Sequence, residues 1–211
     1  MNLLQYHMDR IKRIINDSYP TDNPILNFYD FRHGIKKNKY SVYQTEGLHL
    51  NKKFTPDYKK FLDDAEMVFD YSLNNKEIYE KCIHLPFKLE NVLNVEHNNN
   101  NVAFYGLMNN RRMKFIDFLK ENGVLVTDIS GLCGEELYIE LKKYKFVLSV
   151  GYWDNLTNDS FRLIPAIENG NFIISEKTED WFNDYLISTV PNKVILFDYG
   201  FNSNIIKQIK L

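Results

Sequence analysis

Arginine occurs at the start of two expected helices, where an anionic ligand would bind. The first segment, GLMNNRR at residues 106–112, follows an apolar run and ends in Arg111 and Arg112. The second, NDSFRLIPAIENG at residues 158–170, places Arg162 in the first turn of a helix. The helix dipole disfavours a cation there, whereas helix-start N–H groups bind anions and guanidinium groups pair with phosphate. We therefore expect these segments to bind a diphosphate where they meet.

A glycine and two aromatic residues accompany these arginines. Gly106 lets the backbone approach a ligand closely, because glycine has no Cβ. Tyr152 and Trp153 either stack on a base or sugar ring or close the edge of the hydrophobic core. The arginines have an alternative role as solvated surface cations, and it is their convergence on one crevice that favours a binding site.

Several other chemistries lack their sequence motifs. The chain has no GxGxxG, GxxxxGK[ST], HExxH or GxSxG segment, so dinucleotide, P-loop, zinc-protease and serine-hydrolase sites have no specific support. It has no Asp-x-Asp, the carboxylate pair with which a metal-dependent nucleotide-sugar site holds its cation. Cys82 and Cys133 lack CxxC spacing, which gives no zinc motif and indicates a reducing compartment. We therefore expect the protein to bind the diphosphate without a metal ion.

Composition narrows the class of protein. The 211 residues are 44% hydrophobic and 26% charged, which is enough for a packed core. The formal net charge of −2 argues against a general nucleic-acid binder. The sequence has no apolar run of about 18 residues and no signal-peptide core, so we expect a cytoplasmic protein without a transmembrane segment. Leu4, Met8, Ile11 and Ile15 recur at helical spacing and predict a helix packed on the domain rather than on a membrane surface.

The second half of the chain alternates strictly between strand and helix patterns. Strands are expected at 102–106, 124–129, 146–150, 172–175 and 193–197, and helices at 111–122, 135–144, 158–170, 179–187 and from 202. Five strands alternating with helices predict a doubly wound parallel sheet. Ligands of such sheets bind beyond the carboxyl ends of the strands at the switch in strand order, which we expect beside the first and fourth strands.

The first half predicts a smaller α/β lobe. Strands are expected at 25–30, 40–44, 66–71 and 82–87, and helices at 56–64 and 74–81. The asparagine-rich run at 97–101 is typical of a loop or linker. The chain is therefore predicted to have two domains, an N-terminal lobe at 1–95 and a C-terminal Rossmann-like lobe at 102–211.

Four segments resemble, in order, the motif series of a family of GT-B-type glycosyltransferases found in bacteria, phages and large DNA viruses. They read YQTEGLHLNKKFTPDYKKFL, AEMVFDYSLNN, VAFYGLMNNRR and RLIPAIENGNFIISE. The resemblance implies two Rossmann-like lobes, with a nucleotide-diphosphate sugar held by the second and a glycan or glycoprotein acceptor entering from the first. It also implies metal independence, no cofactor beyond the sugar donor, and the host cytoplasm for a viral protein.

The resemblance assigns roles by position. The donor-side residues are Gly106, Asn109, Arg111, Arg112, Tyr152, Asp159, Ser160 and Arg162. Those on the acceptor side of the cleft are Gln44, Thr45, Tyr71, Ser72 and Asn75. The expected catalytic set is Glu46 as general base, with Arg112 and Arg162 on the leaving diphosphate.

Some of these assignments have alternatives. Glu46 either accepts the acceptor's proton or caps a turn, and His49 and His33 are the other candidate bases. Pro165 stands where many relatives carry a ribose-binding glutamate, and the first lobe is shorter than usual. The predicted function is metal-independent glycosyl transfer. The alternatives are a non-catalytic nucleotide-sugar or glycan-binding module, or a partner subunit of a larger transferase.

Overall fold

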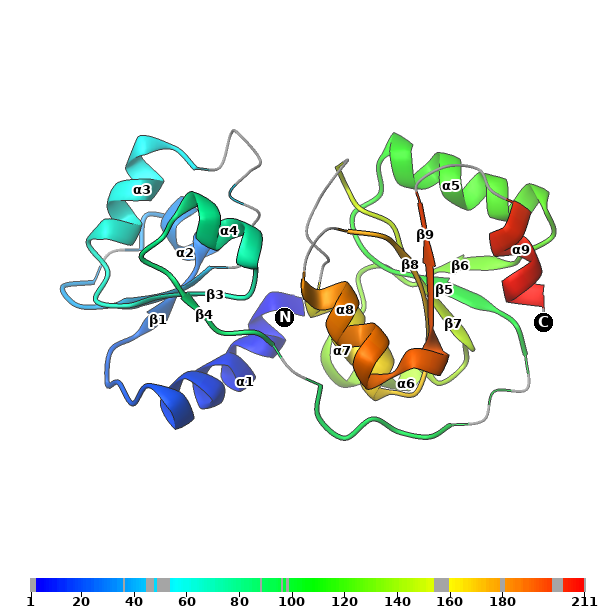
Figure 1. Ribbon diagram of the computed structural model, residues 1–211, viewed down its shortest axis with the longest axis horizontal. Helices are drawn as coiled ribbons and strands as arrows, with labels where there is room; N and C mark the ends of the chain where they lie inside the picture. Colours follow the sequence, from blue (N-terminus) through cyan, green and yellow to red (C-terminus); the bar gives the residue numbers. More distant parts are fainter. Residues whose placement is uncertain are drawn as a thin grey trace. The chain divides into compact units, whose positions relative to one another are not determined.

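The computed structural model describes residues 3–35, 37–44, 48, 54–87, 89–95, 97, 99–153, 160–178, 181–198 and 203–210. The chain divides into two compact units (Figure 1). The first lobe comprises residues 7–87, and the second comprises residues 88–211 together with residues 1–6. In the described residues each lobe has its own parallel sheet flanked by helices, which confirms the predicted α/β class with two Rossmann-like lobes.

The first lobe has a four-stranded sheet in its described residues. Its strands lie in the order β1 (Ile25–Leu26), β2 (Ser41–Gln44), β3 (Val68–Asp70) and β4 (Ile83–His84). The helices are α1 (Leu3–Ser18), which belongs to this lobe from His7 onward, α2 (Phe28–Arg32), α3 (Pro56–Asp63) and α4 (Leu73–Ile78). Met8, Ile11 and Ile15 of α1 are buried, which confirms that this helix packs on the protein through those side chains.

The expected strand at 25–30 is wrong beyond Leu26, because a helix begins there. The side chain of Asn27 accepts hydrogen bonds from the N–H groups of Tyr29 (2.8 Å) and Asp30 (3.2 Å). The Asp30 carboxylate in turn accepts from the N–H of Asn27 at 2.9 Å. This reciprocal capping satisfies backbone donors that a helix start would otherwise leave without partners, so α2 forms in place of a longer strand.

The second lobe carries the five predicted parallel strands. They are β5 (Val102–Phe104), β6 (Val126–Asp128), β7 (Phe146–Ser149), β8 (Phe172–Glu176) and β9 (Val194–Phe197). Their order is β6-β5-β7-β8-β9, so the direction of winding reverses between β5 and β7. The switch therefore lies between the first and third strands of this lobe, and the expectation that placed it beside the fourth is wrong.

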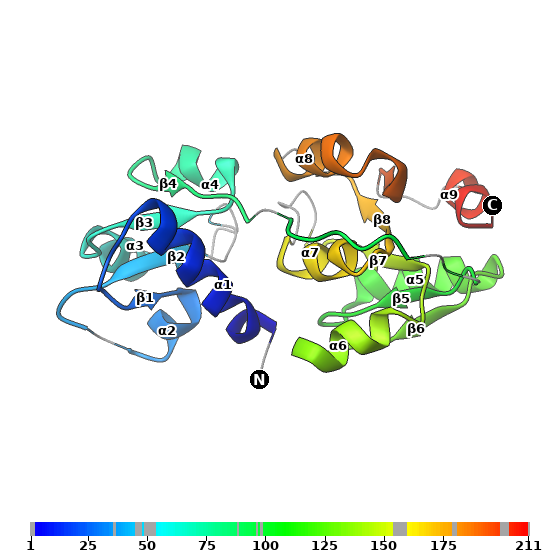
Figure 2. The same ribbon diagram turned by 90° about the horizontal axis from the view of Figure 1, so that it is seen from below.

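Helices cover both faces of this sheet. They are α5 (Asn110–Glu121), α6 (Gly134–Leu141), α7 (Ser160–Glu168), α8 (Trp181–Thr189) and α9 (Ser203–Lys210), with a short 3-10 turn at Pro191–Lys193. Figures 1 and 2 show α5 and α9 on one face and α6, α7 and α8 on the other. Phe115 of α5 stacks on Phe197 of β9 with their ring centroids 4.6 Å apart. No helix among the described residues is long and apolar enough to cross a membrane.

The segment before β5 belongs to the second lobe. The N–H groups of Leu93 and Glu90 donate to the carbonyl and carboxylate of Glu168, at 2.9 and 2.6 Å. A Cβ built at Gly170 would lie 2.9 Å from the Leu93 carbonyl oxygen, and Gly170 has φ +88°. Glycine at this position therefore ends α7 in a left-handed conformation and lets the preceding segment lie against it.

Candidate functional site

Two arginines of the second lobe converge on Gly106, two residues after the end of β5. Gly106 has φ +140°, and a Cβ built on it would lie 2.9 Å from a terminal nitrogen of Arg162 and 3.2 Å from one of Arg112. The two nitrogens are therefore no farther apart than about 6 Å. Gly106, Arg112 and Arg162 are called the arginine cluster below. The structure brings these three residues of the expected donor side together at the switch in strand order.

The Arg112 side chain spans the ends of the two strands that flank the switch. It is 2% exposed, and its Nε donates to the carbonyl of Val150 at 2.9 Å, just beyond β7. A terminal nitrogen donates to the carbonyl of Leu107 at 2.5 Å, just beyond β5. The guanidinium carbon lies 5.3 Å from the centre of the Tyr152 ring, within range of a cation–π contact. These contacts hold Arg112 rigidly at the switch.

Arg162 reaches the same point from the first turn of α7. Its side chain is 6% exposed, and its carbonyl accepts a hydrogen bond from the buried Tyr105 hydroxyl. Tyr105 directly follows β5, so this bond ties α7 to the strand that precedes Gly106. The cation in the first turn is thus a buried residue held against the glycine loop, not a solvated surface group.

Asn109 joins the glycine loop to the loop after β7. Its Oδ1 accepts from the N–H of Arg112 at 2.9 Å and so caps α5, while its Nδ2 donates to the Tyr152 carbonyl at 2.6 Å. The Tyr152 and Trp153 rings meet edge to face, with centroids 4.9 Å apart. Trp153 is 53% exposed, so an aromatic face lies open beside the arginine cluster rather than closing the core.

Ser130 fixes the backbone of Gly106, and sequence reasoning missed it. The Gly106 N–H donates to Ser130 Oγ at 3.0 Å, and this hydroxyl lies 2.9 Å from the Gly106 carbonyl oxygen. Ser130 Oγ also contacts the carboxylate of Asp128, the last residue of β6. A serine directly after the strand expected at 124–129 was the available signal, but only the parallel pairing of β5 with β6 places it beside Gly106.

Arg111 is engaged within the protein. Its terminal nitrogens form a bidentate ion pair with the carboxylate of Glu176, one contact at 2.8 Å, and each side chain is 12% exposed. The same carboxylate accepts from the N–H of Gly151 at 2.9 Å, and Arg111 donates to the Gly151 carbonyl at 2.9 Å. Arg111 and Glu176 thus clamp the loop after β7. Glu176 was not predicted, although it ends the apolar run of β8.

Several predicted residues lie outside the described residues. These are Thr45 and Glu46 on the acceptor side, Asp159 on the donor side, and the alternative base His49. Ser160 begins α7, but its side chain is not among those described. The roles assigned to these residues stay predictions.

The predicted acceptor-side residues Ser72 and Asn75 organise a buried carboxylate, Asp70. The N–H of Ser72 donates to Asp70 Oδ1 at 2.8 Å, and the Asn75 amide donates to Asp70 at 3.0 and 3.2 Å. Asn75 Oδ1 accepts from the N–H of Leu48 at 2.7 Å. Asp70 is 1% exposed, and burial raises the pKa of its carboxyl well above the usual range, although the bonds from Ser72 and Asn75 oppose the shift.

Gln44, Tyr71 and His84 complete the carboxyl edge of this sheet. Gln44 ends β2, is fully buried, and accepts a hydrogen bond from the Tyr58 hydroxyl. Tyr71 is 5% exposed, and its carbonyl lies 3.2 Å from Nε2 of His84, which pairs in register with Asp70 across β3 and β4. Burial lowers the pKa of His84, so its imidazole is neutral near pH 7. A strand at 82–87 was predicted, but it ends at His84, and no signal in the sequence indicated His84 as a base.

His33, another candidate base, lies at the C-terminal end of α2. Its N–H donates to the Tyr29 carbonyl at 3.1 Å, and its ring packs on that of Tyr29 with centroids 3.9 Å apart. Gln44, Asp70 and His84 instead mark the carboxyl ends of β2, β3 and β4. Because α2 runs back from the carboxyl end of β1 towards the start of β2, His33 lies at the other edge of the sheet.

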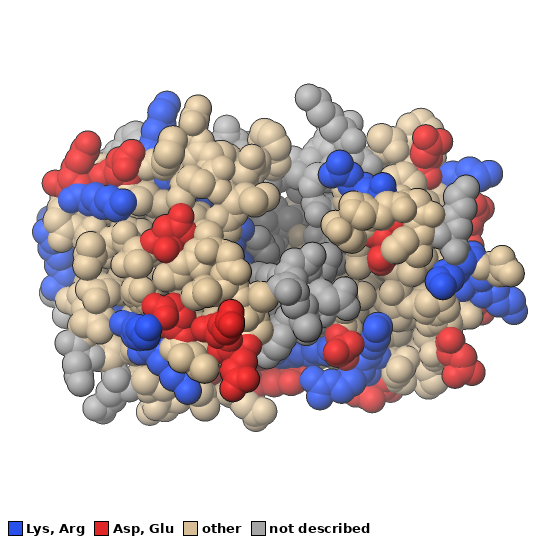
Figure 3. Space-filling model, turned by 180° about the vertical axis from the view of Figure 1, so that it is seen from behind, with Lys and Arg blue, Asp and Glu red and all other residues tan. Residues whose placement is uncertain are grey.

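The described surface carries charges of both signs. Figure 3 shows Lys and Arg side chains interspersed with Asp and Glu over the described residues of the face that it presents. Among the described residues, no three His, Cys, Asp or Glu side chains are grouped so as to hold a metal ion. Metal independence stays a prediction.

Comparison with known proteins gives a structural match without a sequence match. No protein-family model and no curated protein matches the chain. The crystal structure of TarM, a glycosyltransferase of the GT-B type, matches 89% of this chain with a TM-score of 0.58 and 12% sequence identity. The chain spans 47% of the TarM chain, about half its length. At this identity the match shows a shared, GT-B-like fold.

Proposed function

We propose that this protein is a metal-independent glycosyltransferase, which moves a sugar from a nucleotide-diphosphate donor to a hydroxyl group of a glycan or glycoprotein. The observation that carries the proposal is the convergence of Arg112 and Arg162 on Gly106 at the switch in strand order. Ligands of doubly wound sheets bind at this point. The GT-B-like fold that the chain shares with TarM supports the same reaction class.

The charge of the arginine cluster favours a diphosphate ligand. At an effective dielectric constant of about 20, two unit charges no farther apart than about 6 Å repel each other by roughly 3 kcal/mol or more. A diphosphate beside Gly106 would offset this repulsion, and each charge-assisted hydrogen bond to it would contribute about 1.5–3 kcal/mol. Because Gly106 has no side chain, the phosphate can approach the backbone there.

The arginine cluster would act on the leaving group. As the bond between the sugar's anomeric carbon and the diphosphate oxygen breaks, the electron pair and negative charge pass to the diphosphate. Arg112 and Arg162 would stabilise that charge from fixed positions, so little reorganisation is required as the charge develops. The acceptor oxygen forms the new bond to the anomeric carbon and loses its proton. Trp153, exposed beside the cluster, would stack on the nucleobase or sugar.

A group in the first lobe would take that proton. Glu46 is the predicted base, and His84 is a second candidate because its neutral imidazole ends β4. Glu46→Gln and His84→Gln, each assayed for transfer and for donor binding, distinguish the two. The substitution that removes the base should abolish glycosyl transfer and leave the affinity for the nucleotide unchanged.

A nucleotide-sugar-binding module is the second candidate. Gln44, Ser72 and Asn75, predicted to face the acceptor, are fully buried and bonded within the first lobe. They therefore shape the loops at that edge instead of presenting side chains to an acceptor. Such a module, alone or as a partner subunit of a larger transferase, would bind nucleotide diphosphate through the arginine cluster but would not hydrolyse a nucleotide sugar.

The test combines binding with donor hydrolysis. In calorimetric titrations with UDP, GDP, ADP and dTDP, at least one nucleotide should bind with a dissociation constant in the micromolar to millimolar range. Addition of EDTA should leave that affinity unchanged. Arg162→Gln should weaken this binding about tenfold to a hundredfold, whereas Arg13→Gln, on the exposed side of α1, should not. Slow release of free sugar from the matching nucleotide sugar identifies an enzyme. Binding without release identifies a module, and no binding by any nucleotide refutes both.

A further inference from the structure

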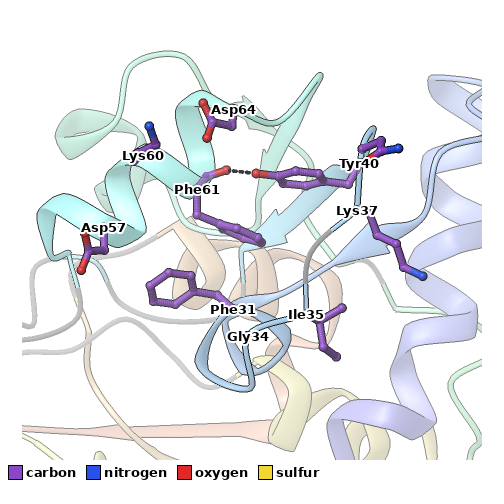
Figure 4. A pocket seen from close by; sticks show the side chains of 10 residues that line it. Phe31, Gly34, Ile35, Lys37, Tyr40, Asp57, Lys60, Phe61 and Asp64 are labelled. Atoms are coloured by element: carbon purple, nitrogen blue, oxygen red, sulfur yellow. Dashed lines mark hydrogen bonds between the residues drawn. The ribbon is translucent and has the colours of Figure 1, made fainter.

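A cavity lies in the first lobe, between α2 and α3. It has a volume of about 570 Å³, within the range of small-molecule sites. Its walls come from two stretches of the chain (Figure 4). The first runs from the end of α2 to the start of β2, and the second is α3 with the residue that follows it. The lining residues are Phe31, Gly34, Ile35, Lys37, Asn38, Tyr40, Asp57, Lys60, Phe61 and Asp64.

This cavity is separate from the carboxyl edge of the sheet. Tyr40 immediately precedes β2, and its carbonyl accepts a hydrogen bond at 2.9 Å from the N–H of Glu66, which precedes β3. Asp64 lies in the same turn, so these residues mark the amino-terminal edge. Asp70 and His84 lie at the opposite ends of β3 and β4. The cavity therefore belongs neither to the arginine cluster nor to the predicted acceptor loops.

Aromatic rings form the apolar wall of the cavity. The Tyr40 and Phe61 rings stack at 5.0 Å and 23°, and Phe31 lies 5.3 Å from Phe61. The Tyr40 hydroxyl donates to the Phe61 carbonyl at 2.7 Å, which fixes the ring orientation (Figure 4). Phe31 and Phe61 are only partly buried, so they keep ring surface available for contact. Such rings bury apolar area at low entropic cost.

The described residues of the rim supply both hydrogen-bond donors and acceptors, and their charges balance. Lys37 and Lys60 supply donors, Asp57 and Asp64 supply acceptors, and Asn38 supplies both. All five residues are exposed. Among the described lining residues, two ammonium groups and two carboxylate groups balance, so this part of the rim favours neither an anion nor a cation. A ligand that suits it is neutral and carries several groups that both donate and accept.

We infer that this cavity binds a neutral saccharide. A sugar ring has an apolar C–H face, which packs on aromatic rings, and an edge of hydroxyl groups that each donate and accept. The ring wall of Phe31 and Phe61 matches the face, and the rim of Asn38, Lys60 and Asp64 matches the edge. A lipid chain would leave this rim without partners, and a phosphorylated ligand would meet Asp57 and Asp64.

Solution NMR tests the assignment on the full chain. Amide spectra of the ¹⁵N-labelled protein are recorded during titration with cellotriose, maltotriose and chitotriose, and with inorganic phosphate as the anionic probe. At least one trisaccharide should shift the signals of residues 31–40 and 57–64, with a dissociation constant in the millimolar range or below. Phosphate should leave them in place. If no trisaccharide shifts these signals at 20 mM, or if phosphate shifts them as strongly, the assignment is wrong.

Matched variants on α3 locate the contact. Lys60→Ala and Asp64→Ala should each weaken trisaccharide binding about threefold to tenfold, the effect of losing one hydrogen bond. Lys59→Ala is the control, because Lys59 is also exposed on the same helix, pairs with Asp63 at 2.6 Å and does not line the cavity. Equal effects of Lys59→Ala and Lys60→Ala would overturn the assignment.

The inference does not rest on the proposed transferase reaction. Nucleotide titration of Lys60→Ala should match the wild-type protein, because the arginine cluster lies in the second lobe. Trisaccharide titration of Arg162→Gln should likewise match the wild-type protein. If the experiments show no binding at one of the two sites, the result for the other site is therefore unaffected.

Discussion

Substitution of Gly106 by alanine perturbs the arginine cluster without removing a guanidinium group. The added Cβ would lie 2.9 Å from one Arg162 nitrogen, 3.0 Å from its guanidinium carbon and 3.2 Å from an Arg112 nitrogen. Ordinary contacts of a Cβ begin near 3.4 Å, so the Arg162 guanidinium must move by about 0.5 Å or more. Charge-assisted hydrogen bonds require close geometry, and a displaced donor loses much of its interaction with phosphate.

The expected loss of affinity is substantial. If the shift disables one charge-assisted hydrogen bond, of about 1.5–3 kcal/mol, nucleotide diphosphate should bind about tenfold to a hundredfold more weakly. Folding stability should also fall, by about 1–3 kcal/mol, because alanine is strained at φ +140°. Calorimetric titration measures the change in affinity, and urea denaturation of the same samples measures the change in stability.

Gly131→Ala is the matched control for backbone strain. Gly131 also has a positive φ, +93°, but a Cβ there would meet nothing within 4 Å. This variant should lose stability with little change in nucleotide affinity. In the double variant Gly106→Ala/Arg162→Ala, the alanine at 106 should cost little further affinity, since the group it displaces is absent.

Two results would refute this reasoning. One is a folded Gly106→Ala protein that binds nucleotide diphosphate as tightly as the wild type. The other is an equal affinity loss in Gly131→Ala, which would mean that backbone strain, not displacement of the arginines, weakens binding. Either result would remove the arginine cluster as the phosphate-binding element.

Three further outcomes are expected. Arg162→Lys keeps the charge but loses the forked geometry, so its nucleotide affinity should fall between those of wild type and Arg162→Gln; equal affinities of the two variants would contradict this. Glu176→Gln should lower the free energy of unfolding by about 3 kcal/mol in urea denaturation, because Arg111 loses its charge partner, and Arg111→Met/Glu176→Leu should recover most of it. The raised pKa of Asp70 means that its protonation favours the folded state. That contribution is complete below the unfolded pKa of about 3.9 and is lost as pH rises through the folded pKa. Asp70→Asn should therefore gain stability relative to wild type between pH 5 and pH 8, and a constant difference would contradict the assignment.

Local sequence patterns predicted most of the second lobe. The strands at β5, β7 and β8 are short apolar runs that end in polar or glycine residues, and such runs form buried parallel strands. The prediction failed at residues 27–30, where the Asn27–Asp30 capping box outweighs the β-propensity of the surrounding aromatic residues. That signal was present in the sequence, but it competes with a strand pattern over only a few residues.

The sequence did not show which residues the side chains of the site contact. Arg111 and Arg112 are adjacent along the chain, yet Arg112 reaches Gly106 while Arg111 pairs with Glu176, 65 positions away. Helix geometry points neighbouring side chains about 100° apart, and only the placement of β7 and β8 decides what each one meets. In the same way, Asn75 was expected at a cleft but bonds to the buried Asp70.

The sequence by itself determined the alternation of strands and helices, the glycine at 106 and the supply of arginine beside it. These features depend on residues close together in the chain. The tertiary structure alone decided where the strand order reverses, which arginine meets the glycine loop and which side chains enclose the cavity between α2 and α3. Those outcomes depend on pairings between strands distant in sequence, because the free energy that selects them comes from burial and packing of the whole lobe.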